Sequence, residues 1–178
     1  MRRINNGCRG VISAVRLFIA VQLSEEVRGE ICRVQENLLR IGIRGNYTPR
    51  ENLHLTLAFI GDYNDPERVL EIMNGINFEP LELRLDGMGC FGDLWWAGLE
   101  SSTELQGYVR QLRHALAEAG IPFDRKRFSP HITVLRRASI ELSRLPEISV
   151  EGIGMVADHA SLMRSDRGKR GMIYTEIQ

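Results

Sequence analysis

The chain has few cysteines, and these are not arranged as pairs. Its three cysteines, Cys8, Cys32 and Cys90, are odd in number, widely spaced and outside any Cys-x-x-Cys motif. This pattern excludes a disulfide framework, argues against a zinc site and fits a reducing compartment. We therefore predict a cytoplasmic protein that uses no metal and no cofactor.

Long apolar runs are also missing. No stretch approaches the roughly 20 apolar residues of a membrane-spanning helix, so we expect no membrane association. Residues 1–21 begin with basic residues that precede an apolar stretch, as a signal peptide does, but Arg16 interrupts that stretch. We reject a signal peptide, expect residues 1–14 to be a disordered extension, and expect residues 15–178 to form a single domain.

Neither sign of charge is in excess. The 23 basic and 23 acidic side chains give a formal net charge of zero, which excludes a protein built for broad, charge-driven coating of nucleic acid. Basic residues nevertheless cluster at 125–127, 136–137 and 164–170. Most of them are expected to be solvated surface, but a phosphate-bearing partner near residues 125–137 remains open.

A short pattern occurs twice, as His54-x-Thr56 and His131-x-Thr133. In a strand, side chains i and i+2 point to the same face, so each histidine stands beside its threonine. A shift of 77 residues (131 − 54) also places residues 17–20 on residues 94–97 and Ser24 on Ser101. This repeat predicts two lobes that face each other across a pseudo-twofold axis and bring both pairs into one cleft.

Hydrophobic periodicity predicts an α+β fold with mainly antiparallel sheets that line the cleft and helices outside. Helices are expected from the N-cap Ser24 to Gly42, from Asp65 to Gly75, and over residues 103–119. The first helix carries an apolar stripe: Val27, Ile31, Val34, Leu38 and Ile41. The expected strands are residues 17–23, 53–60, 81–85, 94–99, 131–135, 148–153, 155–162 and 172–177, with loops over residues 45–52, 121–129 and 165–171.

The two patterns suggest a chemistry. One imidazole can be neutral and the other protonated near neutral pH, so the first takes a proton from water and the second gives one to a leaving alkoxide. The threonine hydroxyls are suited to hold oxygens of the group under attack, and a tetrahedral phosphorus fits such a mirror arrangement. A single His-x-Thr pattern is more simply explained as a strand with polar residues on its solvent-exposed face, whereas two matched copies favour catalysis. A zinc site would need further ligands, which the sequence does not place nearby.

The context of the motifs resembles a known family. Residues 49–61 and 127–136, together with residues 16–21 and 171–174, are similar to the two-histidine (2H) phosphoesterase superfamily, and within it to the RNA 2',3'-cyclic phosphodiesterases, once called 2'-5' RNA ligases. The resemblance covers about residues 16–178. It implies a bilobal α+β fold and metal-independent opening of an RNA 2',3'-cyclic phosphate end to a 2'-phosphate.

The resemblance also implies roles for individual residues. His54 would be the general acid and His131 the general base, and the cationic flank of the second motif also favours a neutral His131. The residue five after each histidine corresponds to a family position, and there the family's arginine, here Arg136, contacts phosphate. Strict alternation points Arg136 and Phe59 away from the cleft, so Arg136 can serve only if the strand bulges or ends near residue 135. We expect Phe59 to be core.

The predicted partner is an RNA end that carries a 2',3'-cyclic phosphate, bound by a monomer through Thr56, Thr133 and Arg136. Two alternatives remain open at this stage: a phosphodiesterase for another small cyclic phosphodiester, or an RNA-end binding module that does not cleave. Phe18 is expected to be a core residue, although it is also placed to stack on a base. Trp95 and Trp96 are neighbours on one expected strand, so one of them must point inward, with the core as its default place.

Overall fold

The computed structural model describes residues 14–141, 150, 152–169 and 171–178. The expected extension therefore lies, apart from residue 14, outside the described residues. In chain order the elements are β1 (Val15–Gln22), α1 (Glu25–Arg40), β2 (Asn46–Tyr47), a 3-10 turn η1 (Arg50–Asn52), β3 (His54–Tyr63), α2 (Pro66–Asn74), β4 (Leu81–Phe91), β5 (Leu94–Leu99), α3 (Thr103–Glu118), β6 (His131–Arg136), β7 (Gly154–Ala157), β8 (Ser161–Gly168) and β9 (Gly171–Ile177).

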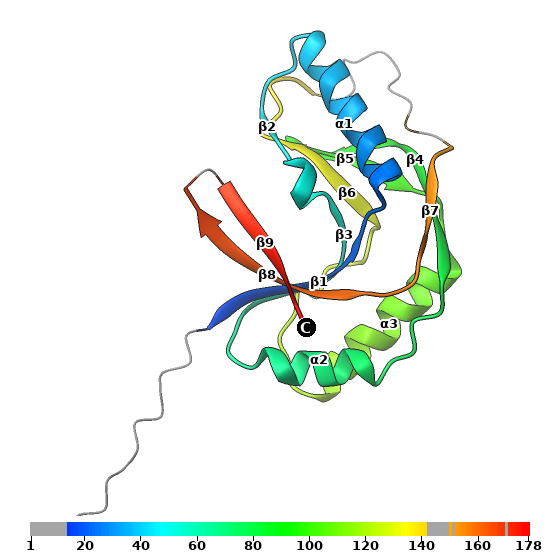
Figure 1. Ribbon diagram of the computed structural model, residues 1–178, viewed down its shortest axis with the longest axis vertical. Coiled ribbons are helices and arrows are strands. Elements are labelled where there is room, and N and C mark those ends of the chain that lie inside the picture. The colour runs from blue at the N-terminus through cyan, green and yellow to red at the C-terminus, as the bar shows by residue number, and fades with distance from the viewer. Residues whose placement is uncertain (1–13, 142–149, 151, 170) are drawn as a thin grey trace, which may run out of the picture.

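The strands form a curled sheet in the order β7-β4-β5-β6-β3-β1-β8-β9, with β2 paired to the end of β6 (Figure 1). Every strand pair of the described residues is antiparallel, which confirms the α+β prediction. The two halves of the repeat share this one sheet and meet where β3 pairs with β6, at Leu55 and Ile132. These two residues are equivalent in the repeat, since 132 − 55 is also 77, so the pseudo-twofold axis runs through their pair.

The opening strands of the two halves align differently from our expectation. Ala20 pairs with Thr56 in the first half, and Trp96 pairs with Thr133 in the second. Ala20 therefore corresponds to Trp96, an offset of 76 residues, and the expected match of residues 17–20 with residues 94–97 is wrong by one position. The error matters because a slip of one residue exchanges the two faces of a strand.

Each half follows its opening strand with a serine-capped helix. The Ser24 hydroxyl accepts a hydrogen bond from the Val27 amide at the start of α1, and Ser102, rather than the expected Ser101, does the same at α3. The helices are exchanged between the halves, because α1 packs on β6 and α3 packs on β3. Four residues of the expected stripe on α1 are buried, but Ile41 is 55% exposed because the helix ends at residue 40.

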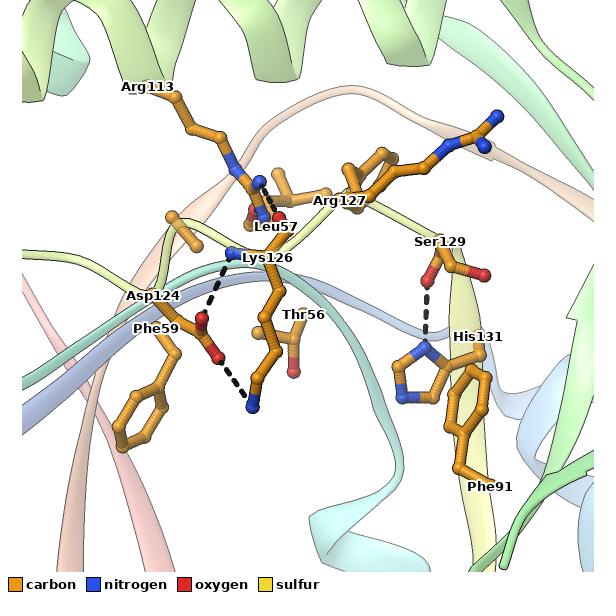
Figure 2. A pocket seen from close by; sticks show the side chains of 12 residues that line it. Thr56, Leu57, Phe59, Phe91, Arg113, Asp124, Lys126, Arg127, Ser129 and His131 are labelled. Carbon is orange, nitrogen blue, oxygen red and sulfur yellow. Dashed lines mark hydrogen bonds and ion pairs between the residues drawn. The ribbon is translucent and has the colours of Figure 1, made fainter.

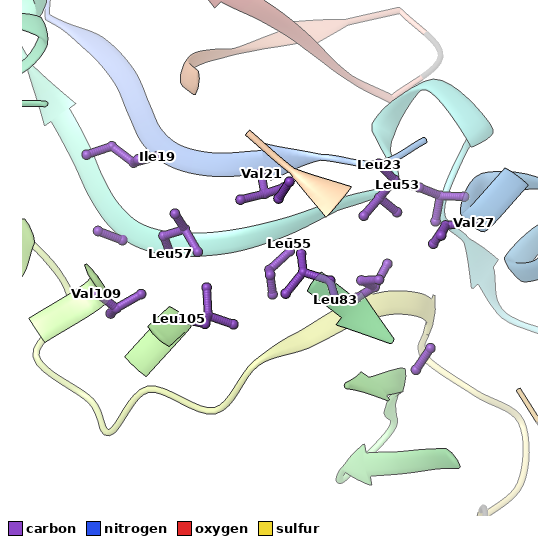
Figure 3. Close-up of a cluster of buried hydrophobic side chains, with 14 of the residues drawn as sticks. Ile19, Val21, Leu23, Val27, Leu53, Leu55, Leu57, Leu83, Leu105 and Val109 are labelled. Carbon is purple, nitrogen blue, oxygen red and sulfur yellow. The ribbon is translucent and has the colours of Figure 1, made fainter. Parts of the chain in front are cut away.

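The main hydrophobic core lies between the helices and one face of the sheet (Figure 3). Leu55, Leu57 and Ile132 are fully buried there, and Leu105 and Val109 of α3 belong to the same cluster. On the opposite face of the sheet, Phe18, Ala20 and Met163 form a second, small cluster. The alternation of each motif strand turns the histidines and threonines toward this second face, away from the helices.

Several loop and strand predictions were wrong in detail. Residues 45–52 include β2 and η1, β4 continues through Gly87 and Gly89 to Phe91, and the expected strand at 155–162 is divided between β7 and β8. The expected basic loop at 165–171 belongs largely to the β8–β9 hairpin. The strand expected at 148–153 falls partly outside the described residues, and the residues described there, 150, 152 and 153, are not in a strand.

Candidate active site

Both motif strands bulge just after the threonine. Ile19 pairs with Ala58 and Ala20 with Thr56, so Leu57 has no partner on β1. In the second half, Trp95 pairs with Leu135 and Trp96 with Thr133, so Val134 has no partner on β5. Two consecutive residues are consequently buried in each strand, Leu57 with Ala58 and Val134 with Leu135. The bulge reverses the alternation beyond it.

The residue five after each histidine therefore returns to the histidine face. Arg136 lines a cavity together with His54 and Thr133, so the alternation problem is resolved by a bulge in the strand. Phe59 is half-buried and lines a cavity together with Thr56 and His131. Our expectation that Phe59 is a core residue was wrong, because the bulge at Leu57 turns it away from the main core.

The register of β3 and β6 crosses the two motifs. Because Leu55 lies opposite Ile132 in an antiparallel pair, His54 falls opposite Thr133, and Thr56 falls opposite His131. Side chains directly opposite lie about 4.5–5.5 Å apart at Cβ, and diagonal neighbours about 7–8 Å apart. The two histidines occupy one diagonal of this group of four and the two threonines the other. A tetrahedral group between the imidazoles would have a hydroxyl on either flank.

Two cavities border this group of four. The first, of about 510 Å³, is lined by His54, Thr133, Arg136, Tyr174 and Met172, and by residues 46–49 and Asn52; we call it the His54 cavity. The second, of about 480 Å³, is lined by Thr56, Phe59, Phe91, Ser129 and His131, with Arg113, Asp124, Lys126, Arg127 and Phe128 farther along its wall; we call it the His131 cavity (Figure 2). Each cavity thus holds the histidine of one motif and the threonine of the other.

A backbone carbonyl anchors each imidazole. Nδ1 of His54 lies 2.7 Å from the Asn52 carbonyl oxygen, and Nδ1 of His131 lies 2.8 Å from the Ser129 carbonyl oxygen. With a proton on Nδ1 donated to the carbonyl, Nε2 is the nitrogen free to exchange a proton with a substrate. Nε2 of His54 lies 3.0 Å from the Thr56 hydroxyl oxygen. Both carbonyls belong to the residue two positions before the histidine, so the same backbone device occurs in each half.

Aromatic side chains flank both imidazoles. The His54 ring lies 4.8 Å from the Phe18 ring and 5.3 Å from the Tyr174 ring, and the His131 ring lies 5.3 Å from Phe91. Trp96 stands 6.2 Å from His131. Phe18 is buried, as expected, and so is Trp95 in the main core, but Trp96 faces the site. Phe91, Tyr174 and the face of Trp96 were not predicted from the sequence, because these residues come from strands other than those of the motifs.

The pKa of His54 is lowered from its ordinary value. Burial is the largest cause, the hydrogen bond to the Asn52 carbonyl opposes it, and the positive charges of Arg136 and His131 lower the pKa further. Arg136 therefore acts across the strand pair on the histidine of the other motif.

The basic residues before the second motif lie close to the site. Lys126 and Arg127 line the His131 cavity, and Arg125 stacks over Phe123. In the hairpin, Arg164 is paired with Asp166, as expected of a solvated surface. No group of three or more His, Cys, Asp or Glu side chains that could hold a metal ion occurs among the described residues. None of the helices in the described ranges is long and apolar enough to span a membrane.

Comparison with known proteins identifies similar chains. Residues 25–169 match the model of the 2'-5' RNA ligase superfamily. The RNA 2',3'-cyclic phosphodiesterase of Thermotoga maritima is 31% identical over 132 residues, which cover 68% of this chain and 70% of that protein. The protein of the same name from Methanothermobacter thermautotrophicus is 29% identical over 92% of this chain and 97% of its own. Among solved structures, Escherichia coli LigT complexed with 3'-AMP superposes with a TM-score of 0.77 at 28% identity, covering 93% of this chain and 96% of LigT.

Proposed function

Because this chain belongs to the 2'-5' RNA ligase superfamily, we propose that it hydrolyses the 2',3'-cyclic phosphate end of RNA to a 2'-phosphate by two-histidine acid–base catalysis. The two relatives described above carry the name RNA 2',3'-cyclic phosphodiesterase, which supports the substrate. The observation that carries the mechanism is the crossed register of β3 and β6, with each histidine opposite the other motif's threonine.

In this mechanism the cyclic phosphate lies between the two imidazoles. Thr56 and Thr133 donate hydrogen bonds to its non-bridging oxygens, and the Arg136 guanidinium supplies a second pair of donors from the His54 cavity. Holding the phosphorus between an acid and a base preorganises an in-line displacement. Neither imidazole needs to move far, because each is fixed at Nδ1 by a carbonyl.

The proton transfers follow from this placement. His131 Nε2 takes a proton from water as the water oxygen bonds to phosphorus, and His54 Nε2 gives a proton to O3' as the bond from phosphorus to O3' breaks. The product keeps its phosphate on O2'. This order of acid and base rests on the family resemblance, since the lowered pKa of His54 by itself disfavours its protonated form. The negative charge of a bound phosphate raises the pKa of a nearby histidine and so favours protonation of His54 in the complex.

The reaction is proposed to need no metal ion, because the acid, the base and the oxygen-binding groups are all side chains. We expect full activity of the purified protein on an oligonucleotide 2',3'-cyclic phosphate in excess EDTA. Loss of activity that one divalent metal restores would contradict this proposal. A linear phosphodiester of the same sequence serves as the negative control.

The identity of the product tests which bond breaks. After digestion, the oligonucleotide is treated with a phosphatase that removes 3'-phosphates but not 2'-phosphates. We expect the product to keep its phosphate, because His54 protonates O3'. A product that loses its phosphate would show that the polarity is reversed while leaving hydrolysis itself established.

We further propose that residues 15–178 form one domain that acts as a monomer, because one chain supplies both histidines, both threonines and Arg136. We also propose a cytoplasmic location, because the odd and widely spaced cysteines fit a reducing compartment. Light scattering of the purified protein tests the oligomeric state. A dimer that loses activity on dissociation would contradict it.

A further inference from the structure

A third cavity lies beside α3, outside the group of four. Its volume is about 400 Å³, and its lining residues are Gln106, Val109, Arg110, Arg113, Arg127 and Phe128. We call it the α3 cavity. It contains neither motif, but it shares Arg113, Arg127 and Phe128 with the His131 cavity, so the two cavities adjoin at these residues.

Three arginines line the α3 cavity, and no acidic residue lines it. Within the described part of the chain, Arg110, Arg113 and Arg127 form no ion pair. The carboxylate of Asp124 acts electrostatically on Arg113 without forming an ion pair with it, and it is engaged by Lys126, through the amide at 3.0 Å and Nζ at 3.5 Å. The cavity therefore has a locally positive potential.

Most arginines of the other two helices form an ion pair, whereas Arg110 and Arg113 of α3 form none with the described residues. On α1, Arg28 and Arg33 each pair with a glutamate three residues earlier, and on α2 Arg68 pairs with Glu71. The residues three positions before Arg110 and Arg113 are a glycine and Arg110 itself. The helix therefore brings two cations together on one face with no acid at that spacing.

Arg113 is fixed in place beside this cavity. Its two terminal nitrogens donate to the carbonyl oxygens of Lys126, at 2.7 Å, and Leu57, at 3.3 Å (Figure 2). Its guanidinium also lies 5.6 Å from the Phe128 ring. Nε of Arg113 is buried without a hydrogen-bond partner. The neutral carbonyls accept hydrogen bonds from the Arg113 guanidinium but do not compensate its positive charge. An anion beside the guanidinium would therefore be stabilised by that charge.

We propose that the α3 cavity binds a phosphate group through Arg110, Arg113 and Arg127. A guanidinium presents paired donors that match two phosphate oxygens, and it is more weakly hydrated than an ammonium group. The phosphate comes either from the backbone of an RNA strand whose end lies between the histidines or from a free phosphate anion. The first source rests on the proposed function, whereas the site itself rests on the geometry of the cavity.

Arg110→Gln tests the site, because Arg110 is exposed on α3 and lines neither cavity at the motifs. Binding of a fluorescent octanucleotide that already ends in a 2'-phosphate is measured by anisotropy, so no turnover is required. We expect the dissociation constant to rise about threefold or more, and the slope of its logarithm against the logarithm of salt concentration to fall by about 0.7. Arg110→Lys should restore most of the binding.

Arg40→Gln is the matched control. Arg40 is an exposed arginine at the end of α1, and its substitution removes the same charge far from α3 (Figure 1). Binding by this variant should equal that of the unsubstituted protein. An equal loss in both variants would show a general charge effect and overturn the site.

Two further arms identify the source of the phosphate. If the RNA strand supplies the phosphate, Arg110→Gln weakens binding of the octanucleotide but not binding of a dinucleotide with the same 3' end. If a free anion supplies it, inorganic phosphate shifts the Nε–H resonance of Arg113 in the unsubstituted protein and not in Arg110→Gln. Absence of both effects overturns the proposal. Because binding is measured on a product end, a failure of cyclic phosphate hydrolysis would leave this result interpretable.

Discussion

The two halves of the site share a backbone and differ in side chains. Each half anchors its imidazole on the carbonyl two residues earlier, places a threonine two residues later, and bulges at the following residue. Around His54, however, the walls are Phe18 and Tyr174, and the Asn52 side chain donates to the Met172 carbonyl at 2.7 Å and so ties β9 to η1.

The second half is more open and more basic. Phe91, beside His131, is 50% exposed, and the cavity wall continues to Lys126 and Arg127. The comparison shows that the duplicated backbone positions the two imidazoles in the same way, while the surrounding side chains give them different neighbours. Equal placement with unequal environment is what an acid and a base require.

The largest expected effect comes from removing either imidazole. We expect His54→Ala and His131→Ala each to lower kcat/KM by on the order of 10²–10⁴, because each removes one proton-transfer group. The double variant should lose much less than the product of the two factors, since the groups act as a unit. Single-turnover hydrolysis of a cyclic-phosphate oligonucleotide measures all three.

The chain provides its own control for this prediction. His114 and His159 are the other two histidines, and both are exposed. His114→Ala should retain the full rate and the full melting temperature. A variant at His54 or His131 that turns over at the rate of His114→Ala would break the two-histidine mechanism.

A smaller effect is expected from Arg136, which belongs to the second motif but acts on the first. Arg136→Ala removes the charge-assisted hydrogen bond that we propose to the phosphate, and such a bond typically contributes about 1.5–3 kcal/mol. The KM of Arg136→Ala should therefore rise about 10-fold or more. The KM of Arg136→Lys should rise less, because lysine keeps the positive charge. An unchanged KM in Arg136→Ala would remove Arg136 from substrate binding.

The same pair of variants tests the electrostatic link between the halves. The charge of Arg136 lowers the pKa of His54, so its removal should raise that pKa toward the ordinary value. The acidic limb of the kcat/KM profile reports the lower of the two coupled pKa values in the free enzyme. We expect this limb to move to higher pH in Arg136→Ala and to stay in place in Arg136→Lys.

The sequence predicted the fold class and the strand positions of both His-x-Thr motifs because these depend on local patterns. Periodicity located the three helices, Ser24 and Asp65 marked the starts of the first two, and the repeat of 77 residues predicted two halves related by a pseudo-twofold axis. Burial of Leu57 beside His54 and Thr56 likewise follows from simple alternation. The structure confirms these elements.

The rest depended on pairing between strands, which a single sequence does not reveal. The bulges at Leu57 and Val134 are defined only against β1 and β5, and they decide that Phe59 and Arg136 face the site. Trp96 could not be assigned to a face while the register was uncertain by one residue. Tyr174 and Phe91 reach the histidines from β9 and β4, so no spacing within a motif could have indicated them.

The smallest expected effect perturbs only the second half. Gly89 on β4 lies directly beneath the Trp96 ring, and a Cβ there would stand 2.2 Å from two of its carbon atoms. Gly89→Ala must therefore displace Trp96, at a cost of about 1–3 kcal/mol in the free energy of unfolding. Gly107→Ala is the matched control, because a Cβ at that helical position meets nothing within 4 Å and should stabilise by about 0.5–1 kcal/mol.

Urea denaturation measures both changes, and histidine resonances show where the change is felt. The Trp96 ring stands 6.2 Å from His131, whereas His54 is bordered by Phe18 and Tyr174. Gly89→Ala should therefore shift the His131 imidazole signals and leave those of His54 unchanged, because the halves share backbone geometry but not aromatic walls. Equal shifts of both histidines would show that the shared sheet transmits the displacement, and the two environments would then not be independently adjustable.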